Sequence, residues 1–185
     1  PDANTLAIGA RLNDGNGNSA GHARIYEWNG SAWVQKGMDI DGEAVFDNSG
    51  WSVSMPDANT LAIGARLNDG NGNMAGHVRI YEWNGSAWVQ KGADIDGEAA
   101  GDQSGWSVSM PDANTLAIGA RGNDGNGNSA GHVRVYTLSP CSQTNASISV
   151  TACNSYTAPS GAIFSTSGTF QDTIPNVAGC DSVIT

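Results

Sequence analysis

Short runs in which large apolar side chains alternate with small or polar ones recur through residues 1–136. The runs WSVSM (51–55) and LAIGA (61–65) both alternate in this way, as β-strands with two different faces do. A longer run, HVRIYEW (77–83), and a shorter one, SAWVQ (86–90), follow them. No segment shows the period of an amphipathic helix. The pattern therefore predicts antiparallel strands joined in a four-stranded meander.

Turn-forming residues separate the predicted strands. Pro56, Asp57 and Asn59 stand between the first two runs, where they supply ordinary turn chemistry. Asn84-Gly85 stands between the last two, and this dipeptide favours a two-residue type I′ hairpin turn. With such a turn Tyr81 would lie opposite Trp88, an aromatic cross-strand pair that stabilises a hairpin.

The predicted meander is repeated along the chain. Residues 1–55 and 56–110 align without gaps and differ at six positions. A third copy begins at residue 111 and follows the pattern to about residue 136, so the period is 55 residues. The first copy lacks the opening strand and the third lacks the last one. We therefore expect the chain to be part of a longer protein.

A single sheet of this size needs neighbours against which to bury its faces. The large side chains of residues 51–55 fall on one face, and Leu61 and Ile63 share a face opposite Ala62 and Gly64. In register, the two strands give each sheet one bulky face and one nearly bare face. Stacked copies would fit bulky face against bare face, in a β-propeller or in a linear stack. Propellers close with about 4–8 blades, so three incomplete sheets would leave the ring open.

The motifs SGWSVSM, LAIGAR and AGHVRIY, in this order, resemble the FG-GAP repeat of integrin-α-type β-propellers. The resemblance covers residues 1–136 and implies incomplete propeller blades with a binding or adhesion role. Many members of that family carry a calcium loop between the first two strands of a blade. Here that connection is only PDANT, which is too short to wrap an ion. Calcium binding at the family position is therefore not implied.

Two other loops in each copy are rich in oxygen ligands with alternate spacing and intervening glycines, as in calcium loops. The alternative is that these residues only form turns and a solvated surface. The candidate calcium ligands are Asp14, Asn16, Asn18, Asp69, Asn71, Asn73, Asp124, Asn126 and Asn128 in the first loop type, and Asp39, Asp41, Glu43, Asp47, Asp94, Asp96, Glu98 and Asp102 in the second.

Tryptophan pairs flank the Asn-Gly turns and could stack on sugar rings, although such residues more commonly pack across strands and against the next sheet. The candidate ligand-binding residues are Trp28, Trp33, Trp83 and Trp88. A histidine also recurs at one strand entry, at positions 22, 77 and 132. We interpret it as structural, because no cysteine lies near it to complete a zinc site.

The composition changes near residue 139. The last 45 residues hold all three cysteines and contain no Lys, Arg, Trp or His. Residues 146–185 resemble a Ser/Thr-rich adhesin repeat of very large secreted bacterial cell-surface proteins. The resemblance implies a truncated β-sandwich-like module and a Cys153–Cys180 disulfide. We predict repeats at 1–55, 56–110 and 111–138, a linker at 139–145 and this module at 146–185, with the partner of Cys141 left open.

The net charge of −10 and the pI near 4.3 disfavour nucleic acid and anionic lipid surfaces as partners. No apolar run is long enough to cross a bilayer. Motifs of hydrolases, phosphate loops and metalloproteases are missing, and the carboxylates recur instead of forming one asymmetric site. We therefore predict a protein without catalytic activity in these residues.

The sequence as a whole predicts an all-β chain of tandem four-stranded antiparallel sheets followed by a smaller β module. Its expected function is extracellular adhesion to a glycan, a matrix component or a surface protein, with further blades of the parent chain as partners and calcium as the one candidate cofactor. Two alternatives stay open. The repeats could be a structural spacer without a ligand, or the non-catalytic arm of a secreted hydrolase.

Overall fold

Every regular element that the structure describes is a β-strand, which confirms the all-β prediction. Contacts between Cα atoms divide the chain into two units, Pro1–Leu138 and Ser139–Thr185. The computed structural model describes residues 3–138, 144–146, 155–158, 163–165, 172–175 and 181–184.

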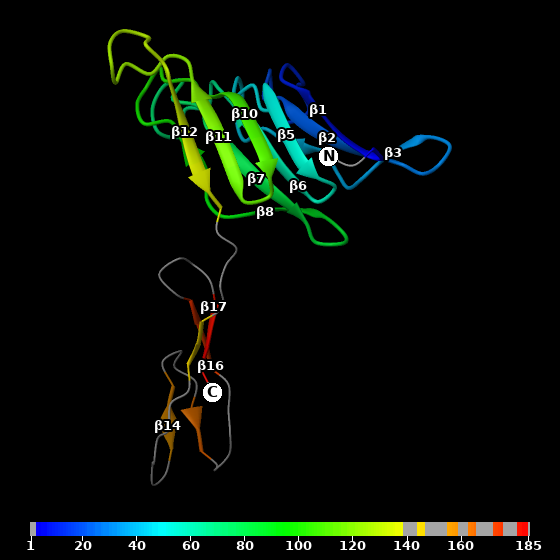
Figure 1. Ribbon diagram of the computed structural model, residues 1–185, viewed down its shortest axis with the longest axis vertical. Coiled ribbons are helices and arrows are strands. Elements are labelled where there is room, and N and C mark those ends of the chain that lie inside the picture. The colour runs from blue at the N-terminus through cyan, green and yellow to red at the C-terminus, as the bar shows by residue number, and fades with distance from the viewer. Residues whose placement is uncertain are drawn as a thin grey trace. The chain divides into compact units, whose positions relative to one another are not determined.

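The first repeat forms a sheet of four strands (Figure 1). Strand β1 (Thr5–Ala10) pairs antiparallel with β2 (His22–Trp28), which also pairs with β3 (Trp33–Gln35). A two-residue strand, β4 (Ile40–Asp41), pairs with the beginning of β2.

The second sheet has the opening strand that the first sheet lacks, and this strand begins in the last residues of the first repeat. This five-stranded sheet runs β5 (Ser52–Asp57), β6 (Thr60–Ala65), β7 (His77–Trp83) and β8 (Trp88–Gln90), with β9 (Ile95–Asp96) paired to β7. The predicted four-strand meander is thus confirmed. The short strand β9, like β4 in the first sheet, was not expected from the alternation of apolar residues because two residues are too few to show a period.

The third sheet has three strands, the first of which begins in the last residues of the second repeat. These are β10 (Ser104–Asp112), β11 (Thr115–Ala120) and β12 (His132–Thr137), in that spatial order. Figure 1 shows the three sheets of the first unit side by side, each presenting a face to the next.

The predicted hairpin register is wrong by two residues. Trp83 lies opposite Trp88, and Tyr81 lies opposite Gln90. The connection is a four-residue loop, because the side-chain oxygen of Asn84 accepts the N–H groups of Ser86 and Ala87 and the Ser86 hydroxyl, at 2.9–3.0 Å. Only Gly85 takes the positive φ that a type I′ turn requires at both central residues.

The stacking prediction is confirmed by two apolar clusters, one at each junction between sheets. The bulky face of the second sheet packs against small residues and isoleucines of the first, and the bulky face of the third sheet does the same against the second. The first cluster contains Ala23, Ile25, Ile40, Met55, Leu61, Ile63 and Tyr81, and the second contains Ala62, Val78, Ile80, Met110, Leu116 and Ile118.

Equivalent positions differ in exposure according to whether a sheet covers them. Ile63 is 1% exposed, whereas Ile8, which holds the same place in the first sheet, is 52% exposed. On the opposite face Val78 is fully buried and Val133, its equivalent in the third sheet, is 67% exposed. The stability of each repeat therefore depends on its neighbours.

Glycines let the backbones approach where the bare face meets the next sheet. A side chain carbon added at Gly64 would lie 2.4 Å from the Gly105 carbonyl oxygen, and one at Gly9 would lie 2.1 Å from that of Gly50. The Ser52 hydroxyl donates to the same Gly105 oxygen at 2.8 Å.

The second unit contains two small sheets. Strand β13 (Thr144–Ala146) pairs parallel with β17 (Asp181–Ile184), which pairs antiparallel with β16 (Asp172–Pro175). Strands β14 (Tyr156–Thr157) and β15 (Ile163–Phe164) form a separate antiparallel pair. The three cysteines, and with them the predicted Cys153–Cys180 disulfide and the open partner of Cys141, lie outside the described residues.

Candidate functional site

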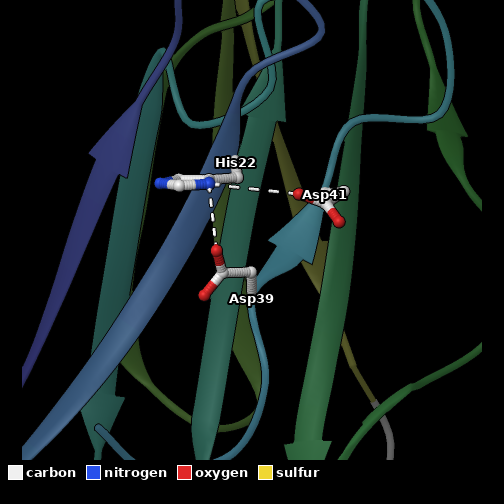
Figure 2. Close-up of side chains that lie close together, drawn as sticks. All are labelled: His22, Asp39 and Asp41. Carbon is white, nitrogen blue, oxygen red and sulfur yellow. Dashed lines mark ion pairs between the residues drawn. The ribbon is translucent and has the colours of Figure 1, made fainter. Parts of the chain in front are cut away.

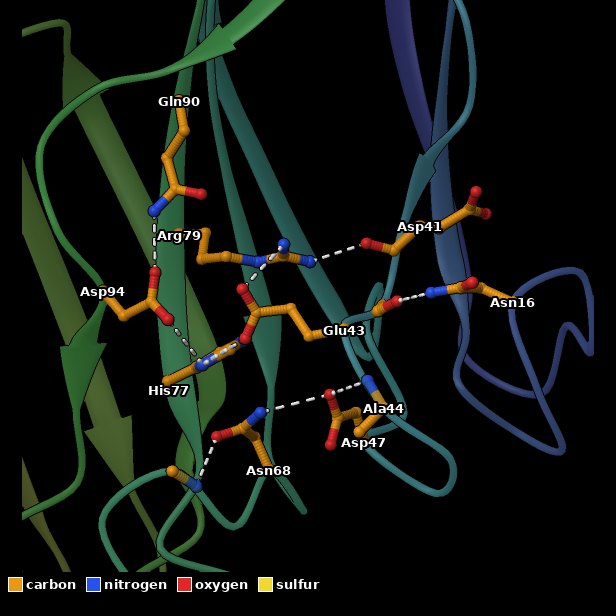
Figure 3. A network of polar contacts seen from close by, with 12 residues as sticks. Asn16, Asp41, Glu43, Ala44, Asp47, Asn68, His77, Arg79, Gln90 and Asp94 are labelled. Atoms are coloured by element: carbon orange, nitrogen blue, oxygen red, sulfur yellow. Dashed lines mark hydrogen bonds and ion pairs between the residues drawn. The ribbon is translucent and has the colours of Figure 1, made fainter.

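A series of polar contacts follows the junction between the first two sheets (Figure 3). It forms because each short strand after a hairpin returns to the beginning of the long strand of its own sheet. Strand β4 places Asp41 opposite His22, and β9 places Asp96 opposite His77. The acidic DIDG segments of the first two repeats, residues 39–42 and 94–97, therefore lie beside the recurring histidine.

In the first sheet the histidine faces two aspartates (Figure 2). The His22 Nδ1 atom lies 3.4 Å from Asp39 Oδ2 and 3.9 Å from Asp41 Oδ1. Arg24 donates from Nε and Nη2 to the two oxygens of Asp39, at 2.8 and 2.7 Å. These hydrogen bonds from Arg24 lower the pKa of Asp39 from 3.8 to about 2. Both oxygens of Asp39 are therefore committed to the guanidinium.

In the second sheet the corresponding arginine has a different partner. Arg79 Nη2 donates to the backbone carbonyl of Asp41, in the preceding repeat, at 2.7 Å. Its Nη1 lies 3.4 Å from Glu43 Oε1, also in the preceding repeat. Asp94, the equivalent of Asp39, keeps only the glutamine contact: the Gln90 amide donates to its Oδ1 at 2.7 Å, as the Gln35 amide does to Asp39. Stacking of the two repeats thus leaves Asp94 Oδ2 facing His77.

His77 lies at the centre of this second cluster. Its Nδ1 is 3.5 Å from Asp94 Oδ2 and 3.9 Å from Glu43 Oε2. The side chain is 1% exposed, and neither ring nitrogen has a hydrogen-bond partner within the described part of the chain. Burial, followed by the charge of Arg79, lowers the pKa of His77. Burial thus favours the neutral form of this imidazole.

The third repeat contains only part of the cluster of histidine, arginine and carboxylates. His132 Nδ1 lies 3.7 Å from Glu98 Oε2, and Arg134 binds Glu98 and the carbonyl of Asp96 at 3.2 and 3.1 Å. Two groups of three side chains among the described residues have the spacing of metal ligands, His22 with Asp39 and Asp41, and His77 with Glu43 and Asp94. In the first group both oxygens of Asp39 are already bonded to Arg24, so only the second group leaves a ligand atom of every member available.

Two other candidate calcium ligands, Asp47 and Asp102, form hydrogen bonds across the junctions between sheets. Asp47 is 3% exposed, and its Oδ2 accepts the N–H of Ala44 at 2.9 Å and the Asn68 amide at 3.1 Å. Asp102 Oδ2 accepts the equivalent hydrogen bonds, from the N–H of Ala99 and from the Asn123 amide, both at 3.0 Å. These carboxylates join each sheet to the loop of the next repeat.

The NDGNGN loops form turns held by their own side chains. In each copy the aspartate accepts a backbone N–H five residues later, at 2.7 Å for Asp14, 2.7 Å for Asp69 and 2.6 Å for Asp124. Asn16 and Asn71 each donate to a glycine carbonyl of the following DIDG segment at 2.7 Å. One aspartate oxygen in each copy therefore serves the turn, and calcium binding at these loops stays a prediction. The exposed asparagines Asn18, Asn73, Asn126 and Asn128 complete the loops.

The tryptophan pairs have one geometry and two environments. Rings of Trp28 and Trp33 lie 5.6 Å apart, as do those of Trp83 and Trp88. The second pair packs against the preceding repeat, where Trp88 Nε1 donates to the Lys36 carbonyl at 2.8 Å. The first pair is 38% and 44% exposed. The pair Trp83 and Trp88 is thus part of the junction between the first two repeats.

Arginine and tryptophan side chains from successive repeats form a ladder of contacts. The rings of Trp51 and Trp106 lie 5.0 Å apart, and Arg66 contacts both, at 3.8 and 4.9 Å from their centroids. Arg11 lies 4.5 Å from the Trp51 centroid and Arg121 lies 4.4 Å from that of Trp106. Burial lowers the pKa of Arg66. This ladder was missed, although the 55-residue spacing of its members in the sequence could have indicated it.

One known protein family is similar to the repeats. The model of the family described as FG-GAP repeat matches part of the chain. The matched residues are 93–136. This range begins before β9 of the second sheet and ends within β12 of the third, so the matched FG-GAP repeat spans a junction between two sheets. No curated protein matches the chain. The resemblance of residues 146–185 to adhesin repeats stays a prediction.

No helix that could cross a membrane is found among the residues that the structure describes.

Proposed function

We propose that this chain is a non-catalytic binding module of a secreted or cell-surface protein, in which stacked FG-GAP-type sheets present a repeated polar edge to a glycan, a matrix component or a surface protein. The FG-GAP match supports a repeat module with a binding or adhesion role. The extracellular location follows only from the resemblance and the composition described above.

The observation that carries this proposal is the set of NDGNGN loops. The three loops have one conformation, with a residue of positive φ at Ser19, Met74 and Ser129 that receives the aspartate hydrogen bond. They join equivalent strands, so they project from one edge of the stack. Repeated, rigid and hydrogen-bonding loops on neighbouring sheets suit a multivalent ligand, because several weak contacts then add up to avidity.

The structural spacer remains a second candidate. It is favoured by Trp83 and Trp88, which serve the packing between repeats and are therefore poorly placed to stack on a sugar. A spacer needs the junctions but not the exposed loop residues.

A binding screen against immobilised glycans and matrix proteins would separate the two functions. The loop variant replaces Asn18, Asn73 and Asn128 with alanine, since these exposed side chains lie outside the junctions. The control variant is Val89→Ala, on the exposed face of β8. The proposal expects saturable binding that the loop variant loses and the control keeps. A wild-type chain that binds nothing in the screen would favour the spacer.

Calcium is included as a proposed cofactor of this edge, since Asp69 and its equivalents each keep a second carboxylate oxygen beside exposed amide oxygens. Repeating the screen with calcium and with a chelator tests it. Binding that is indifferent to the chelator would contradict a calcium requirement.

A further inference from the structure

We propose that Glu43, His77 and Asp94 form a binding site for a divalent transition-metal ion, with Zn²⁺ as the probe. The site lies at the junction of the first two sheets, because Glu43 belongs to the first repeat and the other two residues to the second (Figure 3). It is distinct from the loop edge proposed for adhesion and does not depend on that function.

Each of the three residues offers an atom without another strong partner. His77 Nδ1 is buried and accepts no hydrogen bond from the described residues, although it points at both carboxylates. Asp94 uses Oδ1 to accept the Gln90 amide, which leaves Oδ2 toward the histidine. Glu43 meets Arg79 through Oε1, at 3.4 Å, and presents Oε2 to the histidine.

The distances fit a tetrahedral ion after a small movement. With bonds of about 2.0–2.2 Å, neighbouring ligand atoms of tetrahedral zinc lie roughly 3.3–3.6 Å apart. Here Nδ1 is 3.5 Å from the Asp94 oxygen and 3.9 Å from the Glu43 oxygen, and the three atoms lie within 4.8 Å of one another. The Glu43 side chain is 44% exposed and can close the remaining gap. A water would supply the fourth ligand.

The surroundings resemble the supporting groups of metal sites. Gln90 orients Asp94 through a 2.7 Å hydrogen bond, as outer residues commonly orient a ligating carboxylate. Two carboxylates and one guanidinium give this cluster a charge of −1, which a divalent cation offsets. Arg79 opposes the ion electrostatically, but its short contact is to the Asp41 carbonyl and not to a ligand atom.

The ligand set selects the class of metal. An imidazole nitrogen with two carboxylate oxygens suits zinc and similar ions, whereas calcium takes six to eight oxygen ligands. This site therefore differs from the calcium loops considered above.

Repetition supplies matched controls within the same chain. Asp39 is the equivalent of Asp94, but Arg24 occupies both of its oxygens. Glu98 is the equivalent of Glu43 in the next repeat. It belongs to neither of the two groups of three potential ligands found among the described residues. Among the described residues, the site is thus complete only at the junction of the first two sheets.

The test is titration of the full chain with Zn²⁺ by calorimetry, after chelator treatment and alkylation of the cysteines. Co²⁺ absorption provides a second readout of coordination. Glu43→Gln and Asp94→Asn should each weaken Zn²⁺ binding by about tenfold or more. Glu98→Gln and Asp39→Asn should leave it within about twofold. Circular dichroism of each variant verifies folding, and these half-exposed positions tolerate amide substitution better than buried His77 would.

Zn²⁺ should also raise the melting temperature of the wild type and of both control variants, because an ion bound only to the folded chain stabilises it. The proposal is overturned if the wild type binds no Zn²⁺, or if all four variants bind it as the wild type does. It is equally overturned if the two control substitutions weaken binding as much as the two site substitutions, since binding would then be adventitious to the acidic surface.

Discussion

Gly64→Ala should destabilise the stack through one added methyl group. Gly64 lies within β6 with ordinary strand backbone, so the substitution causes no φ strain. The new carbon would lie 2.4 Å from the Gly105 carbonyl oxygen, which belongs to the next sheet, and 2.4 Å from Ser52 Oγ. Both atoms are joined by a 2.8 Å hydrogen bond and cannot easily move apart. The close approach between two sheets must therefore open.

The size of the effect follows from overpacking and from the lost hydrogen bond. Inserting a methyl group into a well-packed site costs about 1–3 kcal/mol, and a hydrogen bond contributes about 1 kcal/mol. We expect the free energy of unfolding to fall by about 2–4 kcal/mol. For a domain of this size each kcal/mol corresponds to roughly 3–5 °C in melting temperature.

Gly119→Ala is the matched control, at the same place in the third sheet. There the added carbon would meet the Ser107 hydroxyl at 2.4 Å, and the Ser107 side chain is exposed. Its expected cost is below about 1 kcal/mol, because an exposed serine can change rotamer. Urea unfolding followed by tryptophan fluorescence and circular dichroism measures both variants. Equal losses at the two glycines would refute close packing between the sheets.

Three further predictions concern packing and charge. Ile63→Ala should lower the free energy of unfolding by about 2–5 kcal/mol, and Ile8→Ala by less than about 1 kcal/mol, in urea titrations; similar losses would contradict their different burial. Arg66→Ala should cost about 1–2 kcal/mol, because the guanidinium contacts two indole rings; an unchanged denaturation midpoint would show that the ladder adds nothing. The pKa of Asp39, lowered to about 2 by Arg24, makes its stabilising effect complete above about pH 4 and lost as pH falls through about 2. Asp39→Asn should therefore reduce the stability lost between pH 4 and pH 2, and an identical acid transition would argue against the pair.

The sequence predicts the strands and the stacking well, since both depend on local alternation and on repetition. Leu61 and Ile63 opposite Ala62 and Gly64 already indicate one bulky and one bare face. The hairpin register was wrong because Asn84 caps the loop with its own side chain, and an Asn-Gly pair alone does not show that competing arrangement.

The polar junction could be predicted only in part. The acidic DIDG segments stood out as ligand candidates, but His77 was interpreted as purely structural. Its position beside Glu43 requires the preceding repeat to lie against it, which is a contact between residues far apart in sequence. The different partners of Arg24 and Arg79, two identical residues in nearly identical repeats, arise from the same cause. Sequence alone cannot distinguish them.

Thiol labelling at three equivalent positions tests the stacked arrangement most directly. Ile8→Cys, Ile63→Cys and Ile118→Cys place one probe in each sheet, and mass spectrometry of peptides separates them from the native cysteines. The exposed fractions of the three side chains are 52%, 1% and 2%. We predict rapid labelling by a maleimide at position 8 and strong protection at positions 63 and 118 in the folded chain. Equal labelling at positions 8 and 63 would contradict the packing of the second sheet against the first.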